Sequence, residues 1–474
     1  MPDFDVVVIG SGAAGLCAAL EANRAGARVL VAESEAVIGG SSRLSGGIIM
    51  AAGTRLQQAH GIEDSVEDLF YEYMTFNQWK LEPAVVHRLV DNARSAVEWL
   101  EDMGVEFVPE LYPAGKERVR RSHMPAGAGQ AVVNVLHAQC KRAGVEFAMG
   151  RRIDRLVVSD GRVRGVAAGD DELSANSVVI ATGGFAASKE MLQEYWPEGL
   201  QGGDWTWYIG EDGHGSRGDA FALGAQVDAQ IAGRGRGVML LEPNFGHNIN
   251  IYNPGWLIMV NGEGRRFFDE TYPYSTTQPA AFGEPKPIYA IWDHGAKCAS
   301  NEVPDLKDLY MPTEVATSHW QEPILDEMAA RGVVVQAESI EKLAAEIGIS
   351  PENLAGTVAT YNRDVRNGKD SAYFKRPDLM RSIDTPPYYA TELRFCTIGL
   401  TTTGLRINAD AEVIDGRSQV IPGLYAAGEC TGGIIGDVYM GTGNSYANAV
   451  VFGRVAGQSA AASALSRADH DGSV

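Results

Sequence analysis

The fold is decided by the first stretch of the chain, Phe4-Asp5-Val6-Val7-Val8-Ile9-Gly10-Ser11-Gly12-Ala13-Ala14-Gly15. Its short β-branched run, residues 4–9, predicts a strand buried on both faces of a parallel sheet. The GxGxxG spacing follows at once. The first glycine permits a tight turn, the second lets the backbone approach a pyrophosphate, and the third lets a helix pack on the strand. We therefore predict a dinucleotide-binding βαβ unit.

The residues after the glycines complete this unit. A helix expected over residues 13–25 aims its first N–H groups at the phosphates. Arg28 to Ala32 predicts the second strand, and Glu33 stands at its end. That carboxylate can accept hydrogen bonds from a ribose diol and would repel a 2′-phosphate, so FAD or NAD fits better than NADP.

Three later segments favour FAD over NAD. Residues 37–47 read Val-Ile-Gly-Gly-Ser-Ser-Arg-Leu-Ser-Gly-Gly, a run of small residues that lets the chain pass close to a bulky, elongated ligand. Residues 178–185 and 423–429 each predict a buried strand that ends in small residues. The expected cofactor contacts are Gly10, Gly12, Ala13, Ala14, Gly15, Glu33, Ser34, Gly40, Ser41, Ser42, Ser45, Gly46, Gly47, Ala181, Thr182, Gly183, Gly428, Glu429, Asn444 and Ser445.

Composition excludes several classes of protein. With 474 residues the chain is long enough for two domains. A net charge of −21 argues against nucleic acid and anionic membrane partners. The five cysteines show no CxxC or metal-type spacing and the nine histidines show no metal-ligand spacing, so we expect reduced thiols, no bound metal and a cytoplasmic location. No signal peptide or membrane-spanning stretch is expected.

The pattern along the chain suggests an insertion. Helical spacing dominates residues 65–103, residues 147–168 alternate as antiparallel strands with a turn at Asp160-Gly161, and a glycine-rich turn at 212–220 opens a helix to 223. From about residue 237 tryptophan, tyrosine and proline become frequent, with helices expected at 338–346 and 351–367. Pro386-Pro387 marks the return. The last helix is expected over 444–465, followed by a frayed polar tail.

These segments resemble the flavoprotein family of fumarate reductases, succinate dehydrogenase flavoprotein subunits and 3-ketosteroid dehydrogenases. The resemblance covers nearly the whole chain and implies an α/β fold: a Rossmann-like, glutathione-reductase-like FAD-binding domain with an inserted α+β catalytic (cap) domain. We place the first at 1–237 and 388–474 and the second at 238–387. Succinate dehydrogenase subunits bind FAD covalently through a histidine near residues 41–43, where this chain has Ser41, Ser42 and Arg43, so the resemblance implies non-covalent FAD.

Two departures from the fumarate reductases bear on the substrate. Those enzymes use arginines and histidines because their substrates carry carboxylates. The position that matches their C-terminal arginine is Tyr439, and the segment that matches their histidine, residues 395–402, contains none. Reduction of a dicarboxylate is therefore disfavoured.

The tyrosines instead resemble those of 3-ketosteroid Δ1-dehydrogenases. Tyr439-x-Gly441-x-Gly443 is similar to the pattern in which a tyrosine hydroxyl and the second glycine's amide hold the substrate ketone, although Met440 and Thr442 depart from it. Such donors would stabilise an enolate. Residues 266–274, Arg-Phe-Phe-Asp-Glu-Thr-Tyr-Pro-Tyr, are similar to the segment whose final tyrosine is the catalytic base.

The resemblance thus implies four catalytic residues. Tyr274 is the base, with Asp269 in place of the family's asparagine and Tyr272 as its competitor. Tyr439 and Gly443 hold the ketone, and Tyr112 is a looser match to a tyrosine that assists the base.

The predicted reaction is FAD-dependent introduction of a C=C bond α,β to the carbonyl of a cyclic ketone, with 3-ketosteroids as the leading substrate class and an unidentified electron acceptor. Three alternatives remain: a small ketone such as cyclohexanone or 4-oxocyclohexanecarboxylate, a fumarate- or acrylate-type reductase, and a non-enzymatic FAD protein. The first would be favoured if one of two arginine clusters, 118–121 with His123 or Arg234 with Arg236, faced the substrate. Ion pairs with the excess acids are the simpler reading of both.

Overall fold

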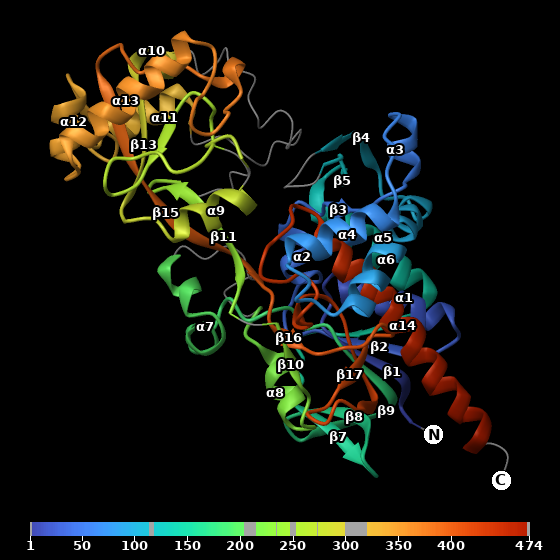
Figure 1. The fold of residues 1–474 in the computed structure, drawn as a ribbon. Coiled ribbons are helices and arrows are strands. Elements are labelled where there is room, and N and C mark those ends of the chain that lie inside the picture. The colour runs from blue at the N-terminus through green and yellow to red at the C-terminus, as the bar shows by residue number, and fades with distance from the viewer. Residues whose placement is uncertain are drawn as a thin grey trace. The chain divides into compact units, whose positions relative to one another are not determined.

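The protein's structure is a computed structural model that describes residues 2–112, 118–202, 215–233, 235–246, 253–272, 274–298 and 320–471. The chain forms two compact units (Figure 1). The first comprises Met1–Val238 with Gly399–Val474, and the second comprises Met239–Ile398. The predicted insertion began at residue 238 and ended at 387, immediately before a strand, β15 (Tyr388–Thr401), that runs from the second unit into the first. The predicted roles of the two domains stay predictions.

The first unit is built on a parallel sheet of order β18-β9-β1-β2-β6, with β17 antiparallel at one edge. Strands β1 and β2 are mainly apolar and buried, as the β-branched runs predicted, and β9 is buried over its last four residues, 177–180. The predicted α/β, Rossmann-like class is confirmed. The strands are β1 (Phe4–Ile9), β2 (Val29–Ala32), β6 (Glu146–Ala148), β9 (Asp171–Ile180), β17 (Glu412–Ile414) and β18 (Val420–Ala426).

The predicted antiparallel segment is only partly correct. Strands β7 (Arg155–Ser159) and β8 (Arg162–Ala168) form the hairpin, with Asp160 and Gly161 at positive φ of 52° and 71° in its turn. Strand β8 then pairs with β9 and so continues the main sheet. Phe147, however, lies in β6, which pairs in parallel with β2. A short strand of three residues carries too little pattern to tell the two pairings apart.

Helices α1 (Ala13–Arg24) and α14 (Asn444–Asp471) lie side by side over this sheet (Figure 1). Glycines on α14 allow the close approach, because a Cβ at Gly453 would lie 2.5 Å from the Ala14 carbonyl oxygen and one at Gly457 would lie 2.2 Å from that of Ala18. The predicted end at residue 465 was wrong. The helix continues to Asp471, since no glycine or proline interrupts the sequence before Gly472.

The other elements of the first unit surround the sheet. A small sheet of order β3-β5-β4 joins β3 (Ile49–Met50), β5 (Ser122–Pro125) and β4 (Phe107–Tyr112). A pair of short strands joins β10 (Ile231–Ala232) to β16 (Gly404–Leu405). The helices are α2 (Gly40–Leu44), α3 (Arg55–Ala59), α4 (Val66–Phe76), α5 (Pro83–Asp102), α6 (Ala128–Ala143), α7 (Lys189–Tyr195), η1 (Pro197–Gly202), α8 (Asp219–Ala225) and η6 (Gly428–Cys430). The predicted start of α8 at residue 212 lies outside the described residues.

The second unit is an antiparallel sheet covered by helices. Its strands run in the order β11-β15-β13-β12, with β14 also paired to β15. Helices α12 and α13 match the predicted 338–346 and 351–367 closely and bury Leu343 and Leu354 against Ile258 and Ile291 of the sheet. The elements are β11 (Gly237–Pro243), β12 (Ile258–Val260), α9 (Tyr274–Phe282), β13 (Ile288–Asp293), α10 (His294–Cys298), α11 (Glu322–Ala330), β14 (Val335–Ala337), α12 (Ile340–Glu346), α13 (Pro351–Arg366) and η5 (Pro377–Leu379).

In the part of the chain that the structure describes, no helix is long and apolar enough to cross a membrane.

The contact between α1 and α14 gives a first prediction. Gly457→Ala should lower the free energy of unfolding by about 1–3 kcal/mol, because the added methyl group overlaps the Ala18 carbonyl. Gly356→Ala is the matched control, since a Cβ there meets no atom within 4 Å and should stabilise α13 by about 0.4–1 kcal/mol. Thermal unfolding measures both. Equal changes in melting temperature for the two variants would contradict the close contact between α1 and α14.

Candidate functional site

Four parallel strands of the first unit end at the same level. Ile9 of β1 pairs with Ala32 of β2 and Ile180 of β9, and Ile180 pairs with Ala426 of β18. Each predicted cofactor segment begins just after one of these strand ends or at the start of α14. In open parallel sheets ligands bind at the carboxyl ends of the strands. The structure therefore brings the predicted cofactor residues of distant segments to one edge.

The three motif glycines have different reasons to be glycine. Gly10 has φ +102°, and a Cβ there would lie 2.4 Å from the Ala181 carbonyl oxygen. A Cβ at Gly15 would lie 2.0 Å from the carbonyl oxygen of Gly10. Gly12 is different, because its φ of −62° suits any residue and the nearest atom to its Cβ would be Ser42 Oγ, at 3.4 Å. Protein packing requires the first and third glycines but leaves the second exposed for a ligand.

The predicted ribose-binding acid is already held in place. One carboxylate oxygen of Glu33 accepts hydrogen bonds from Ser11, from its amide at 2.8 Å and from its hydroxyl at 2.5 Å. The other accepts from Ser34 Oγ at 3.2 Å and from the Glu35 amide at 2.9 Å. A carboxylate has about four lone-pair positions, and these four bonds use them and fix the orientation of Glu33, so a ribose diol would have to replace one of them, such as the 3.2 Å bond from Ser34.

Helix α2 presents its small residues to the start of α1. Ser42 Oγ accepts a hydrogen bond from the Ala13 amide at 3.0 Å, and Ser41 Oγ lies 3.5 Å from Ser216 Oγ. The next turn is fixed by Ser45, whose carbonyl accepts from the Gly129 amide at 2.9 Å. A Cβ at Gly129 would lie 2.0 Å from the Ser42 carbonyl oxygen. Gly129 was not predicted, although the Gly127-Ala128-Gly129 run before α6 is a signal for close approach.

Gly46 and Gly47 follow that turn. Gly47 has φ +66°, and a Cβ there would lie 2.7 Å from Gly129 Cα, so backbone packing alone requires it. Gly46 has no such conflict, since its Cβ would lie 3.4 Å from Ile48. Gly40, at φ +46°, has no atom within 4 Å of its Cβ position.

A residue that follows β18 at this edge, Glu429, is partly exposed as a whole but holds its carboxyl group inside the protein. Glu429 Oε1 accepts hydrogen bonds from Thr401, from its amide at 2.8 Å and its hydroxyl at 3.0 Å. A Cβ at Gly184 would lie 2.1 Å from the same oxygen, so only glycine fits there. Burial raises the pKa of Glu429 to about 7, although the hydrogen bonds from Thr401 and the Gly184 amide favour the ionised form.

Two polar atoms at this edge are buried without a partner in the described chain. They are Thr182 Oγ1, after β9, and Asn444 Oδ1, at the first residue of α14. Buried polar atoms are normally hydrogen-bonded, so these two indicate a ligand that offers hydrogen-bond donors. Together with the space beside Gly12 and the oriented Glu33, they fit a dinucleotide such as FAD.

A phenol stands at the N-terminus of α14. The hydroxyl of Tyr439 lies 3.4 Å from Ser445 Oγ in the first turn of the helix. The carbonyl of Gly443, which has φ +115°, accepts a hydrogen bond from the Met50 amide at 3.1 Å, and a Cβ at this position would lie 2.8 Å from the Met50 nitrogen. The loop that carries the predicted ketone-binding pair is therefore fixed against β3. A helix N-terminus also favours negative charge nearby.

The small sheet brings Tyr112 close to the same loop. Tyr112 pairs with Ser122 across β4 and β5, and Ser122 Oγ donates a hydrogen bond of 2.8 Å to the Thr442 carbonyl. Burial raises the pKa of Tyr112, so its phenol is neutral at ordinary pH. The structure thus gathers three predicted catalytic residues, Tyr112, Tyr439 and Gly443, around one region of the first unit.

In the second unit the two candidate bases differ in burial. Tyr274 begins α9 and is 6% exposed, whereas Tyr272 is 48% exposed. Asp269, which replaces the family's asparagine, accepts hydrogen bonds from the Thr271 amide at 3.0 Å and the Thr271 hydroxyl at 2.7 Å. The aspartate therefore holds the turn just before Tyr274.

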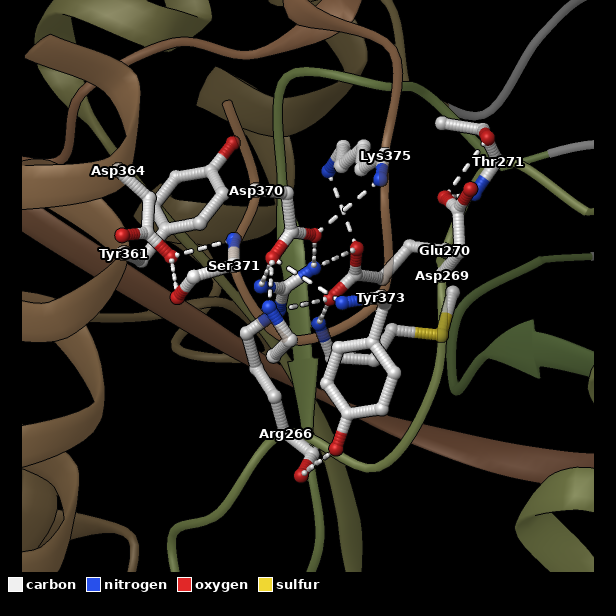
Figure 2. A network of polar contacts seen from close by, with 12 residues as sticks. Arg266, Asp269, Glu270, Thr271, Tyr361, Asp364, Asp370, Ser371, Tyr373 and Lys375 are labelled. Carbon is white, nitrogen blue, oxygen red and sulfur yellow. Dashed lines mark hydrogen bonds and ion pairs between the residues drawn. The ribbon is translucent and has the colours of Figure 1, made fainter. Parts of the chain in front are cut away.

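A buried ionic network fixes the segment that leads to Tyr274 (Figure 2). Arg266 binds Glu270 with two hydrogen bonds, 2.7 and 2.9 Å, and reaches Asp370 at 3.1 Å. Lys375 Nζ donates to Glu270 at 3.1 Å and to the Leu257 carbonyl at 2.8 Å. Burial alone would raise the pKa of Glu270, but Lys375 and Arg266 hold it below its usual value. Two cations and two anions balance, which is how buried charges are tolerated. Sequence reasoning missed this network, because residues 370 and 375 lie far along the chain.

The basic cluster of the first unit is structural. Arg121 is almost fully buried. It donates two hydrogen bonds of 2.8 and 2.7 Å to the Asp64 carboxylate and forms an ion pair with Glu72. His123 is buried against Thr54, and burial lowers its pKa to about 4, so it is neutral. Arg236 is exposed, and Arg234 lies outside the described residues.

Three tryptophans pack together in the second unit, where the sequence is rich in them. Trp256, Trp292 and Trp320 meet edge to face at centroid distances of 5.8–6.2 Å, and Tyr389 stacks on Trp292. They are core residues, and Trp205 and Trp207 lie outside the described residues.

Comparison with known proteins agrees with this geometry. A family model described as an FAD binding domain matches residues 5–446. A fumarate reductase (cytochrome) from Shewanella frigidimarina is 34% identical over 481 residues, which cover 96% of this chain and 77% of the relative. The predicted resemblance to this flavoprotein family is confirmed.

Two solved structures share the fold. The 3-ketosteroid-Δ4-(5α)-dehydrogenase of Rhodococcus jostii RHA1, in complex with 4-androstene-3,17-dione, has a TM-score of 0.78 and 25% identity, and the match covers 97% of this chain and 96% of that one. The 3-ketosteroid Δ1-dehydrogenase of Sterolibacterium denitrificans has a TM-score of 0.80 at 21% identity, covers 97% and 99% of the two chains, and bears on the fold alone.

The space beside Gly12 gives a second prediction. Gly12→Ala should fold normally, because its Cβ has no close neighbour in the protein, but should weaken FAD binding by about tenfold or more by blocking the approach of the pyrophosphate. Quenching of flavin fluorescence measures the Kd, and the melting temperature of the flavin-free protein is the control. An unchanged Kd would contradict this role.

The raised pKa of Glu429 gives a third prediction. Its folded-state pKa, about 7, exceeds the ordinary value of 4.5, so the carboxyl stabilises the fold least when it is ionised. Wild-type protein should therefore lose stability relative to Glu429→Gln as the pH rises from about 5 to 8, by on the order of 1–3 kcal/mol. Thermal unfolding of the two flavin-free proteins at both pH values measures this. A difference that does not change with pH would contradict the burial of the carboxyl.

Proposed function

The chain belongs to the FAD-binding oxidoreductase family, whose members here are reductases and dehydrogenases of C=C bonds, and we propose that it is a dehydrogenase of cyclic ketones. The proposed reaction introduces a C=C bond α,β to the carbonyl, with a 3-ketosteroid as the substrate class. The electrons taken from the substrate then pass to a separate acceptor. We also propose a cytoplasmic location.

The observation that carries the proposal is the place of the Tyr439 hydroxyl at the N-terminus of α14. It lies 3.4 Å from Ser445 Oγ, and Tyr73 and Ser122 hold the same loop through hydrogen bonds with Asn444 and Thr442. The nearby Arg121 is fully engaged by Asp64 and Glu72. Phenol and amide donors at a helix N-terminus suit a carbonyl oxygen that becomes negative, whereas a dicarboxylate requires free cations.

Each catalytic residue has a proposed part. Tyr439 and the Gly443 amide polarise the ketone, Tyr274 removes the α-proton, and Tyr112 assists the base. When bound, FAD supplies the acceptor for the β-hydride. An unperturbed tyrosine has a pKa of about 10, so removal of the proton by Tyr274 requires either a depressed pKa of its phenol or hydride loss in the same step.

The proposed FAD contacts are the predicted cofactor residues of the four strand ends and the start of α14. Ser41, Ser42 and Arg43 replace the histidine that would form a covalent bond, so we propose non-covalent FAD.

A second candidate is reduction of the C=C bond of an acrylate-type substrate. Its support is that the curated relatives include fumarate reductase at 34% identity and urocanate reductase from Eggerthella lenta at 30%. For the small ketone 4-oxocyclohexanecarboxylate, Arg121 is committed to Asp64 and Glu72, whereas Arg118, Arg120 and Arg236 are exposed.

The fourth prediction tests Tyr439. Under anaerobic conditions, 4-androstene-3,17-dione or a saturated 3-ketosteroid should bleach the oxidised flavin, and Tyr439→Phe should slow this step by about 10²–10³-fold because one oxyanion donor is lost. Stopped-flow absorbance measures the rate constant.

Tyr446→Phe is the matched control. Tyr446 lies on α14, seven residues after Tyr439, and its buried hydroxyl has no hydrogen-bond partner in the described chain, so the rate should not change. The ketone proposal fails if the steroid reduces the flavin of Tyr439→Phe as fast as that of the wild type. It also fails if the protein reacts only with fumarate-type acids.

A further inference from the structure

The loop that carries Tyr439 is hydrogen-bonded to the C-terminal end of α4, a helix that contains none of the sequence motifs. Asn77, the residue after α4, is buried and 2% exposed. Its Oδ1 accepts a hydrogen bond of 3.1 Å from the Val438 amide, next to Tyr439. Its Nδ2 donates to the Tyr73 carbonyl at 3.2 Å, one turn back on α4. Asn77 thus joins the end of α4 to the Tyr439 loop.

The loop is shaped to admit this side chain. Gly436 has φ +85°, and a Cβ there would lie 2.1 Å from Asn77 Oδ1. Glycine is therefore needed at 436 on two counts, conformation and contact. The loop and the asparagine fit one another at two points, Gly436 and Val438.

The previous turn of α4 holds the other end of the loop. The hydroxyl of Tyr73 accepts a hydrogen bond of 3.4 Å from Asn444 Nδ2, at the first residue of α14. Burial raises the pKa of Tyr73, with the neighbouring Tyr439 adding to the effect, so Tyr73 is a neutral hydrogen-bonding group. Tyr73 and Asn77 therefore contact the segment on both sides of Tyr439.

The backbone after Asn77 is strained. Gln78 and Trp79 both have left-handed φ, 53° and 55°, although neither is glycine. Such conformations cost about 1–2 kcal/mol each for residues with a Cβ and persist where the surroundings fix them. The turn keeps its shape through hydrogen bonds from Gln78 N to the Thr75 carbonyl and from Trp79 N to the Met74 carbonyl, 3.0 and 2.8 Å.

We propose that Asn77 is a positioning residue for the proposed reaction: its amide side chain holds the 436–438 backbone so that the Tyr439 hydroxyl stays at the N-terminus of α14. Tyr73 supports the same loop from its far end. The inference rests on the proposed role of Tyr439, and it adds a residue that acts through Tyr439 without touching substrate.

A double-mutant cycle tests whether Asn77 acts through Tyr439. With 4-androstene-3,17-dione as the probe, Asn77→Ala should lower the rate constant of flavin reduction by about tenfold or more in the otherwise wild-type protein. In the Tyr439→Phe background it should lower it by less than about twofold, because the hydroxyl that it positions is gone. Equal fractional losses in both backgrounds would overturn the proposal, since a general structural defect acts in both.

A second measurement is independent of the substrate. 3-Fluorotyrosine incorporated at position 439 should give one ¹⁹F resonance in the full-length holoprotein. Asn77→Ala and Gly436→Ala should each shift or split it, the second by pushing the asparagine side chain away. An unchanged resonance in both variants would overturn the proposal. If the steroid fails to bleach the flavin while the resonance responds, the proposed substrate is wrong and the positioning role stands.

Asn92→Ala is the matched control. Asn92 makes the same kind of bond one turn back, from Nδ2 to the Arg88 carbonyl at 2.9 Å, but on α5 and with no contact to the Tyr439 loop in the described chain. It should leave both the rate and the resonance unchanged. Asn77→Asp keeps the oxygen that faces Val438, so it should retain the wild-type resonance better than alanine does. Equal disturbance by both would show that only the bond within α4 matters, which would overturn the proposal.

Discussion

The arrangement depends on the close approach of backbone at Gly10. The turn after β1 passes so near Ala181 that a Cβ would lie 2.4 Å from its carbonyl oxygen, and α1 starts so near that turn that Gly15 has no room for a side chain either. These two contacts hold β1, β9 and α1 at their separation. The ends of four parallel strands then fall level, and segments from residue 10 to residue 445 reach one edge.

Buried arginine and lysine side chains in both units pair with buried carboxylates and so stabilise the fold. Arg121 is neutralised by Asp64 and Glu72 in the first unit, and Arg266 and Lys375 by Glu270 and Asp370 in the second. The hydrogen bonds described around the start of α14 come from the hydroxyls of Tyr73, Ser122, Tyr439 and Ser445 and from the Asn444 amide. This division connects the fold to the proposed chemistry, because an uncharged set of donors suits a ketone and an enolate better than a dicarboxylate.

Much of the first unit could be predicted because its signals are local. The glycine spacing, the β-branched runs and Glu33 specify the βαβ unit within about thirty residues, which is why its two strands and its helix were predicted correctly. The residues that sequence reasoning missed act over long separations. Asn77 meets Val438, Arg266 meets Asp370, and Gly129 meets Ser42, and no periodicity in a single sequence reports such pairs. The predicted end of α14 was wrong because the polar residues 466–471 are typical of a frayed tail, although none of them is a glycine or proline that would break a helix.

The central claim is that the oxidised protein removes two hydrogen atoms from a cyclic ketone. Single-turnover product analysis tests it most directly: stoichiometric holoenzyme and 3-ketosteroid are mixed without oxygen, and the steroid is recovered for mass spectrometry. We expect a steroid product that is lighter by two hydrogen atoms and has a new C=C bond next to the carbonyl. Its amount should equal the amount of flavin reduced. Unchanged ketones, together with a dithionite-reduced flavin that is reoxidised by fumarate or urocanate, would contradict it.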